Sequence, residues 1–484
     1  MNVLFASSEV WPLVKTGGLG DVSYSLPHAL KATGHNVHLI MPAYREVLQQ
    51  CTNLRILSWL DSPYGETRPT LRLLEAKHEK IDVTLWLIDC PDLYDRPGNP
   101  YLGPDGHDWA DNAERYTQFA WAVSQIATGN AIKDWQADVV HANDWQCGLI
   151  PAFLDQEARR PRRVFTIHNL AYGGHFSEAQ FQALGLPEHW WSPEGAEFYG
   201  GFSMLKAGLI YSDAISTVSP TYAEEICTPQ FGHGMEGILA SRRYKLTGIL
   251  NGIDTDIWNT ETDPYLPYHY SADKVQPGKR NNKRALLEKV TDTVSEAMLD
   301  APLMGMVTRL VEQKGVDLIT HAIPILLAET NANFMLMGSG SPYYERILLE
   351  LSELHPGRVF TFIGYSEPMA HLVEAGSDLF LMPSRFEPCG LNQMYSLQYG
   401  TLPVVNYTGG LADTVVNASI DAIEDGSATG FVMYSADTNA LISTLQHALH
   451  LYQHPKMWQQ IQQKAMRQDF GWAHSAAKYL SIYQ

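Results

Sequence analysis

The sequence predicts an α/β protein made of two doubly wound halves, each with a parallel sheet covered by helices on both faces. Short apolar runs alternate with helical patterns along the whole chain, and each run ends in a polar cluster. A glycine-rich turn opens a helix near residue 17, and another does so near residue 409. At 484 residues the chain is too long for one core, so two domains are expected.

The composition describes an acidic protein, with 53 acidic and 34 basic residues and a formal net charge of -19. Such a chain repels nucleic acid and anionic membranes, so we expect neither as a partner. Any phosphate that it binds needs basic side chains at the binding site, because the overall charge is negative. The five cysteines form no Cys-x-x-Cys pair, which favours a reducing compartment over a cysteine zinc site. No secretory signal and no run of about 18 apolar residues is found, so we expect a cytoplasmic location.

The first predicted strand, Asn2–Ala6, leads into a glycine-rich segment, Lys15–Val22, that opens a predicted helix. Without side chains at Gly17 and Gly18, backbone N–H groups there can face a ligand, and together with the helix dipole they suit an anion such as phosphate. Lys15 adds a full positive charge at the same loop. A plain strand-to-helix turn with a surface lysine explains the same residues, so this motif does not decide the function alone.

Polar residues follow the other predicted strands of the first half. The second strand, 35–41, ends without the carboxylate that would hold a ribose, which argues against a dinucleotide dehydrogenase. Asp144 and His168 follow later strands, at the sheet edge where such folds bind ligands. Taken singly, each is more often a helix cap or a structural residue. The remaining strands predicted here are Ile81–Ile88, Ala137–His141, Val164–Ile167 and Ala214–Val218.

The second half follows a segment without periodicity. Residues Asn259–Gly278 are rich in Pro, Asp and Tyr and are predicted to connect the domains, and the basic residues around 274–284 are predicted to be solvated. The facing strand edges of the two halves are expected to form an interdomain cleft. Strands are predicted at Pro302–Val307, Asn333–Met337, Val359–Ile363, Leu379–Met382 and Leu402–Val405.

Several motifs together resemble bacterial glycogen synthases and plant starch synthases, which are retaining glucosyltransferases of the two-domain GT-B fold. The matches span nearly the whole chain in the expected order. They are Lys15–Val22, Thr166–Tyr172, Thr217–Ala223, Leu250–Asp254, Arg309 with Gln313–Gly315, Pro383–Leu391 and Thr408–Thr414.

The chain departs from that family at three positions. Asn143 stands where a histidine is usual in His-x-His-Asp-Trp, and Gln146 stands where a second histidine is common. Tyr395 occupies the position of the second glutamate of the wider GT-B group, so a ribose contact by that carboxylate cannot be assumed. None of the three changes touches the cations expected to bind phosphate.

The resemblance implies two Rossmann-like domains facing across a deep cleft. Residues 1–247 would form the acceptor side with the glycine loop, residues 248–463 the donor side, and residues 464–484 a helical segment that packs back on the first domain. The implied reaction transfers glucose from ADP-glucose to the non-reducing end of an α-1,4-glucan, with UDP-glucose as the alternative donor. No cofactor or metal is expected, since Asp254-Thr255-Asp256 is predicted to be a capped turn.

The resemblance also assigns roles to residues. Cations would stabilise the departing nucleoside diphosphate, Glu387 would hold the donor glucose, and His168 would lie near the reacting carbon. Asp144 would face the acceptor, and the Tyr365 ring would stack on adenine, with core packing as its alternative. The implied catalytic residues are Lys15, Asp144, His168, Arg309, Lys314 and Glu387, and the implied donor contacts are Lys15, Gly18, Asp21, Asn169, Asn251, Arg309, Lys314, Tyr365, Glu387, Cys389, Gly390, Leu391, Thr408, Gly409 and Gly410.

Three questions stay open on the sequence alone. An aromatic cluster of Trp190, Trp191, Phe198 and Tyr199 can be a glucan-stacking surface or part of the core. A glycosidase would need two neighbouring carboxylates, but the candidates Asp144 and Glu387 come from opposite halves. A glucan-binding protein without activity would be expected to have lost the phosphate-binding cations, which are present.

Overall fold

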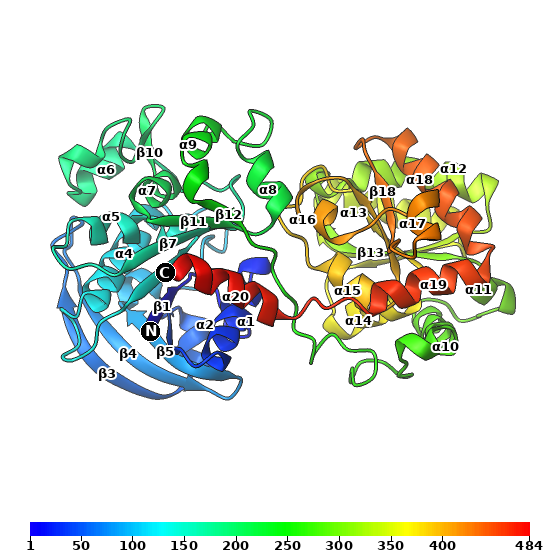
Figure 1. Ribbon diagram of the computed structural model, residues 1–484, viewed down its shortest axis with the longest axis horizontal. Coiled ribbons are helices and arrows are strands. Elements are labelled where there is room, and N and C mark those ends of the chain that lie inside the picture. Colours follow the sequence, from blue (N-terminus) through cyan, green and yellow to red (C-terminus); the bar gives the residue numbers. More distant parts are fainter. The chain divides into compact units, whose positions relative to one another are not determined.

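The computed structural model describes residues 1–484 and divides into two compact units (Figure 1). The first unit holds Met1–Gly252 together with Trp472–Gln484, and the second holds Ile253–Gly471. The division therefore falls after Gly252 rather than after residue 247. Residues 464–471 belong to the second unit, because the helix that ends at Met466 packs within it.

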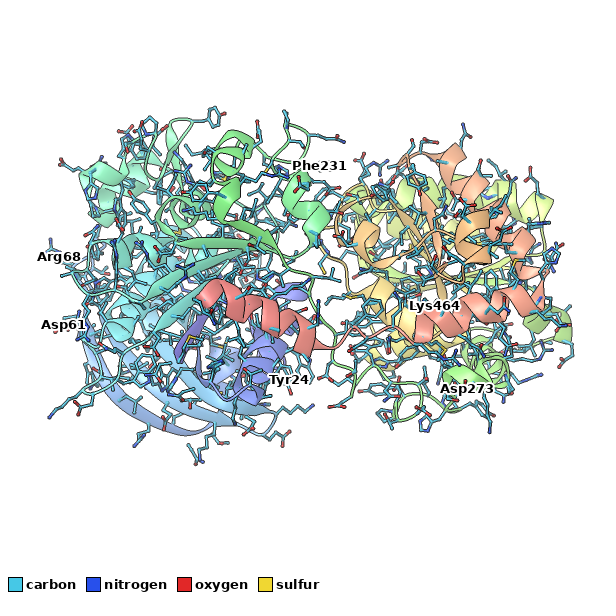
Figure 2. All side chains as sticks on the ribbon, viewed as in Figure 1. Tyr24, Asp61, Arg68, Phe231, Asp273 and Lys464 are labelled. Atoms are coloured by element: carbon cyan, nitrogen blue, oxygen red, sulfur yellow. The ribbon has the colours of Figure 1, made fainter.

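The first unit is built on a nine-stranded sheet in the order β12-β11-β7-β6-β1-β2-β5-β4-β3. The strands from β12 to β5 are parallel, and β4 and β3 extend the sheet as an antiparallel hairpin that the sequence did not predict. Asp61 and Arg68, labelled in Figure 2, lie at the end of that hairpin. The strands are β1 Asn2–Ala6, β2 Asn36–Pro42, β3 Thr52–Asp61, β4 Thr70–His78, β5 Ile81–Asp89, β6 Val139–Asn143, β7 Arg162–Ile167, β11 Ala214–Thr217 and β12 Leu246–Gly248.

The middle strand β1 is buried on both faces, since Val3 to Ala6 are all fully buried, as its unbroken apolar run predicts. Helix α1 buries Leu19, Val22, Leu26 and Leu30 on one face and ends before Gly34, whose φ of +88° favours glycine. The C-terminal helix α20 packs against α1 (Figure 1). The helices of this unit are α1 Gly18–Ala32, α2 Arg45–Gln50, α3 Pro91–Tyr94, α4 Asn112–Ala127, α5 Leu149–Asp155, α6 Glu178–Leu184, α7 Met204–Tyr211, α8 Pro220–Glu225, α9 Glu236–Ser241 and α20 Trp472–Tyr483.

A small antiparallel sheet completes the first unit, in the order β8-β10-β9, with β8 at His175–Ser177, β9 at Glu197–Phe198 and β10 at Gly201–Ser203. The aromatic cluster considered above as a glucan surface lies beside it. Trp190 is fully buried and packs on Phe153, so it belongs to the core, whereas Tyr199 is exposed.

The second unit is built on a six-stranded parallel sheet in the order β15-β14-β13-β16-β17-β18. Strand β13 is longer than predicted and includes Arg309, because it pairs with β14 along its whole length. The strands are β13 Leu303–Leu310, β14 Asn333–Gly340, β15 Val359–Ile363, β16 Leu379–Met382, β17 Leu402–Asn406 and β18 Phe431–Met433. The helices are α10 Val275–Leu287, α11 Glu296–Asp300, α12 Val316–Glu329, α13 Pro342–Leu354, α14 Glu367–Gly376, α15 Asn392–Gln398, α16 Gly409–Thr414, α17 Ile420–Glu424, α18 Thr438–Tyr452 and α19 Pro455–Met466. None of the helices in either unit has both the length and the apolar character needed to cross a membrane.

The segment predicted to connect the domains is instead an ordered part of the second unit. Asp263 is fully buried and accepts hydrogen bonds from His371 Nδ1 at 2.7 Å and from the Tyr399 hydroxyl at 2.5 Å. Trp258 is stacked between the rings of His371 and Tyr395, with centroid distances of 3.8 and 3.7 Å. The prediction was wrong because these contacts are made by single side chains and leave no periodic pattern in the sequence.

The basic residues after that segment are likewise not all solvated, because Lys279 and Lys283 are buried. The Lys279 ammonium donates to Ala375 O at 2.9 Å and to the Thr401 hydroxyl at 2.6 Å, and burial lowers its pKa to about 7. Lys283 pairs with the Asp378 carboxylate at 2.6 Å. Lys279 therefore joins α10 to α14 and to the residue before β17, and Lys283 joins α10 to the residue before β16.

Candidate active site

In the first unit, a buried carboxylate holds the glycine loop that follows β1. Glu9 accepts hydrogen bonds from the Thr16 backbone N–H at 2.7 Å, from the Thr16 hydroxyl at 2.6 Å and from the Gly17 N–H at 3.3 Å. The Tyr101 hydroxyl donates to the same carboxylate at 2.5 Å. These hydrogen bonds hold the loop without a ligand, and they use the N–H groups of residues 16 and 17. An anion would therefore bind to the N–H groups at the start of α1, where Gly18 is exposed. Sequence reasoning missed Glu9, because nothing in the motif marks it.

Lys15 projects from this loop and is partly exposed. Its ammonium pairs with the Asp21 carboxylate at 2.8 Å, where Asp21 lies in the first turn of α1. The pair brings together two residues that the sequence analysis assigned to the donor. A surface pair of this kind contributes little stability, so an anionic ligand can replace the carboxylate at Lys15 at low cost.

Asp144 follows β6 in a backbone conformation that ordinary residues avoid, with φ of +57° and ψ of -178°. That region is essentially restricted to glycine, and a residue held there costs about 1–3 kcal/mol. Its carboxylate accepts hydrogen bonds from the backbone N–H groups of His168 at 2.7 Å and Asn169 at 3.5 Å. Burial raises the pKa of Asp144 to about 7, and the nearby Glu9 charge adds to the rise, although the two N–H bonds oppose it.

His168 follows β7 and is nearly buried, and burial lowers its pKa to about 3, so the ring is neutral near neutral pH. Its Nε2 lies 2.9 Å from Asn143 Oδ1. Neighbouring β6 and β7 therefore bring Asp144, His168 and Asn169 together at the carboxyl edge of the sheet. Asn251, at the end of the first unit, has a buried amide oxygen with no hydrogen-bond partner, and a bound ligand could donate a hydrogen bond to it.

In the second unit, Arg309 lies near the end of β13, where its guanidinium is exposed and makes no hydrogen bond or ion pair. Lys314 lies in the next turn and pairs with Glu387 Oε2 at 2.6 Å. The Ser384 hydroxyl donates to the same oxygen at 3.0 Å, and Glu387 is buried. Since β13 and β16 are neighbours, the loops after them carry these residues to one edge of the sheet.

Backbone contacts and glycines fix the position of Glu387. The Arg385 N–H donates to Gln313 O at 2.8 Å, which joins the two loops. Gly315 has φ of +71°, and a Cβ there would lie 2.3 Å from Pro383 O. A Cβ on Gly409 would lie 1.8 Å from Glu387 O, so only glycine lets the start of α16 approach that loop.

The remaining predicted donor contacts lie in the same loops or follow the neighbouring strands of the second unit. Tyr365, after β15, is 63% exposed and so is not a core residue, and its hydroxyl contacts Glu367. Tyr395 is buried on α15 against Trp258. Asp254 Oδ1 accepts the N–H of Asp256 at 3.0 Å, as a capped turn predicts. The other predicted contacts are Cys389 and Thr408, which are buried, Gly390 and Leu391, which are partly exposed, and Gly410, whose N–H donates to Glu387 O at 3.2 Å.

Comparisons with known proteins agree with both halves of the chain. A family model described as the starch synthase catalytic domain matches residues 2–241, and one described as glycosyl transferases group 1 matches residues 291–465. A glycogen synthase of Hydrogenovibrio crunogenus is 50% identical over all of this chain and 99% of its own length. A glycogen synthase of Thioalkalivibrio sulfidiphilus is 48% identical over all of this chain and 99% of its own.

Two solved structures resemble the whole chain. The catalytic domain of starch synthase IV from Arabidopsis thaliana, bound to ADP and acarbose, has a TM-score of 0.85 and 31% identity, and the match covers all of this chain and 98% of that one. A sucrose-phosphate synthase from Thermosynechococcus elongatus has a TM-score of 0.60 at 18% identity over all of this chain and 98% of its own, which supports the fold alone. The predicted fold of two Rossmann-like α/β domains is confirmed.

Proposed function

We propose, from the premise that this chain belongs to the starch and glycogen synthase family, that it elongates glycogen with glucose from ADP-glucose. The glucose would be transferred to the 4-hydroxyl at the non-reducing end of an α-1,4-glucan with retention of configuration. That a starch synthase of similar structure binds ADP and acarbose supports a nucleotide-sugar donor and a glucan acceptor. None of the five cysteines is in a disulfide, which supports a reducing compartment, and we propose the cytoplasm.

The observation that carries the proposal is the set of charged residues at one sheet edge of the second unit. Arg309 is exposed without a partner, and Lys314 is paired with the nearly buried Glu387. When the glycosidic bond breaks, negative charge grows on the nucleoside diphosphate, and a bidentate guanidinium and a lysine suit that charge. Removing one such donor typically costs about 3–4 kcal/mol, or on the order of 10²–10³ in rate. We assign the diphosphate to Arg309 and Lys314 and the glucose hydroxyls to Glu387.

The first unit would supply the other charges and the groups around the reacting carbon. Lys15, now paired with Asp21, would move to the diphosphate, and the N–H groups at the start of α1 would add partial positive charge. Neutral His168 would accept or donate a hydrogen bond at the sugar, and Asp144 would face the acceptor. Because the assigned residues come from both units, we expect donor binding to bring the units together.

A transfer assay tests the proposal. The full-length protein is given ¹⁴C-glucose as ADP-glucose or as UDP-glucose, with glycogen as acceptor, and the product is digested with an enzyme that cleaves only α-1,4 bonds. We expect label in the digestible chains and a higher kcat/KM with ADP-glucose. Lys15→Ala should slow transfer at least about tenfold and leave the thermal unfolding unchanged.

Each alternative predicts a different result in the same assay. A preference for UDP-glucose would leave the reaction class standing and overturn the donor assignment. Binding to glycogen without label transfer would mean a glucan-binding protein and would overturn the proposal. Release of glucose from glycogen without a nucleotide sugar would indicate a glycosidase. Wild-type turnover by the Lys15→Ala variant would remove the phosphate role of Lys15.

A further inference from the structure

Asn143 has an amide whose orientation is fixed by its surroundings. The side chain is fully buried at the end of β6. Its Nδ2 donates to Ala6 O at 3.0 Å and points also toward His141 O at 3.4 Å. Turning the amide over would set Oδ1 against two carbonyl oxygens, so the hydrogen bonds themselves assign oxygen and nitrogen. Oδ1 therefore faces His168 Nε2, 2.9 Å away.

This orientation determines where the proton of His168 sits. A carbonyl oxygen only accepts, so the contact is a hydrogen bond only if Nε2 carries the hydrogen. A neutral imidazole has one N–H, and the lowered pKa of this buried ring keeps it neutral. Nδ1 is then left with a lone pair, and it has no hydrogen-bond partner within the protein. A histidine in place of Asn143 would not fix the proton in this way, since either of its nitrogens can donate or accept.

Two consecutive residues of the first unit thus hold His168 by different atoms. Asp144 accepts the backbone N–H of His168 at 2.7 Å, and Asn143 accepts the ring N–H at 2.9 Å. The first bond sets the position of the residue, and the second sets the rotation and the tautomer of the ring. The strained backbone at Asp144 follows Asn143 directly, as expected where the chain is held against its preference for a function.

We propose that Asn143 is a positioning residue of the transfer reaction, which fixes His168 as the Nε2–H tautomer and so makes Nδ1 a hydrogen-bond acceptor for a sugar hydroxyl. The acceptor role at the sugar rests on the proposed function, and the tautomer does not. With Nδ1 as a fixed acceptor, the ring binds a hydroxyl as the hydrogen-bond donor and orients its oxygen. Loss of such a hydrogen bond costs about tenfold in rate.

The first test measures the tautomer in the wild-type protein. The full chain is labelled with ¹⁵N-histidine, and the ring signals of His168 are found by comparison with a His168→Gln variant. We expect a protonated Nε2 and an unprotonated Nδ1 at neutral pH, without any substrate. The opposite assignment, or an equal mixture of tautomers, would overturn the proposal. Because this measurement needs no activity, it decides the tautomer even if glucose transfer fails.

The second test compares variants in the same spectra and in the transfer assay. Asn143→Leu removes the acceptor, so the tautomers should mix and kcat should fall about tenfold, with ADP affinity unchanged by calorimetry. Cys147→Ala is the matched control, because Cys147 Sγ also donates to Ala6 O, at 3.4 Å, but does not contact His168. It should keep the wild-type tautomer. An Asn143→Leu variant with wild-type kcat would refute the positioning role, and Asn143→His should recover part of the rate.

Discussion

The raised pKa of Asp144 gives a prediction about stability whose sign and size follow from the structure. Burial raises this pKa from 3.8 to about 7. Between those values the native protein binds a proton that the unfolded chain does not, so the free energy of unfolding falls as pH rises through this range. At about 1.4 kcal/mol per pH unit, the loss from Asp144 between pH 5 and pH 8 is about 2–3 kcal/mol.

Asp144→Asn removes this titration and keeps an oxygen that can accept the His168 N–H. The variant should therefore gain about 2–3 kcal/mol relative to the wild type on going from pH 5 to pH 8, because only the wild type has the Asp144 titration. Urea unfolding at several pH values measures this difference. Fluorescence reports mainly on the first unit, since only Trp258 and Trp458 of the twelve tryptophans lie in the second. If the difference in the free energy of unfolding between the two proteins were the same at every pH, the reasoning would be refuted.

Two further predictions concern the backbone of the site. Asp144→Gly should be more stable than Asp144→Ala by about 1–2 kcal/mol, because glycine relieves the strained φ and ψ, although both variants should lose transfer. Urea unfolding measures the difference in stability, and equal unfolding midpoints would contradict the backbone strain. Gly409→Ala should weaken ADP binding in calorimetry by at least about tenfold, because its Cβ would clash with Glu387 O and push the start of α16, which carries the predicted donor contacts Gly409 and Gly410, out of place. Gly426→Ala is the control, because Gly426 also has a positive φ but its Cβ would meet nothing within 4 Å. The idea fails if both glycine variants bind ADP equally.

Most strands could be predicted from the sequence, and so could the sheet edge that carries the candidate site. Buried parallel strands need unbroken apolar runs, and their carboxyl ends must hold the polar residues that follow, which is why Asp144 and His168 were expected together. The β3–β4 hairpin was missed because β3 is mostly exposed and does not alternate in polarity. Strands of that kind carry no clear signal in a single sequence.

The sequence did not reveal which hydrogen bonds hold the predicted residues and their loops in place. Glu9 takes its role from donors at residues 16, 17 and 101, and that convergence exists only in the folded chain. Lys279 is satisfied by backbone carbonyls and a hydroxyl, partners that no motif records. Asn143 was noted as a departure from the family, but its meaning depended on which way its amide points.

The pairing of Lys314 with Glu387 explains, within the proposed function, why the intact donor should be favoured over the nucleotide product. The two side chains are 17% and 9% exposed and lie 2.6 Å apart. If a phosphate draws Lys314 away, the buried carboxylate keeps only the Ser384 hydroxyl, and a buried charge that loses its partner is strongly destabilising. The hydroxyls of a glucose can donate hydrogen bonds to Glu387 in place of the lysine. A nucleotide sugar therefore supplies new partners for the carboxylate from which its own phosphates have drawn Lys314 away. A nucleoside diphosphate alone cannot do so, and it leaves the site more readily than the donor.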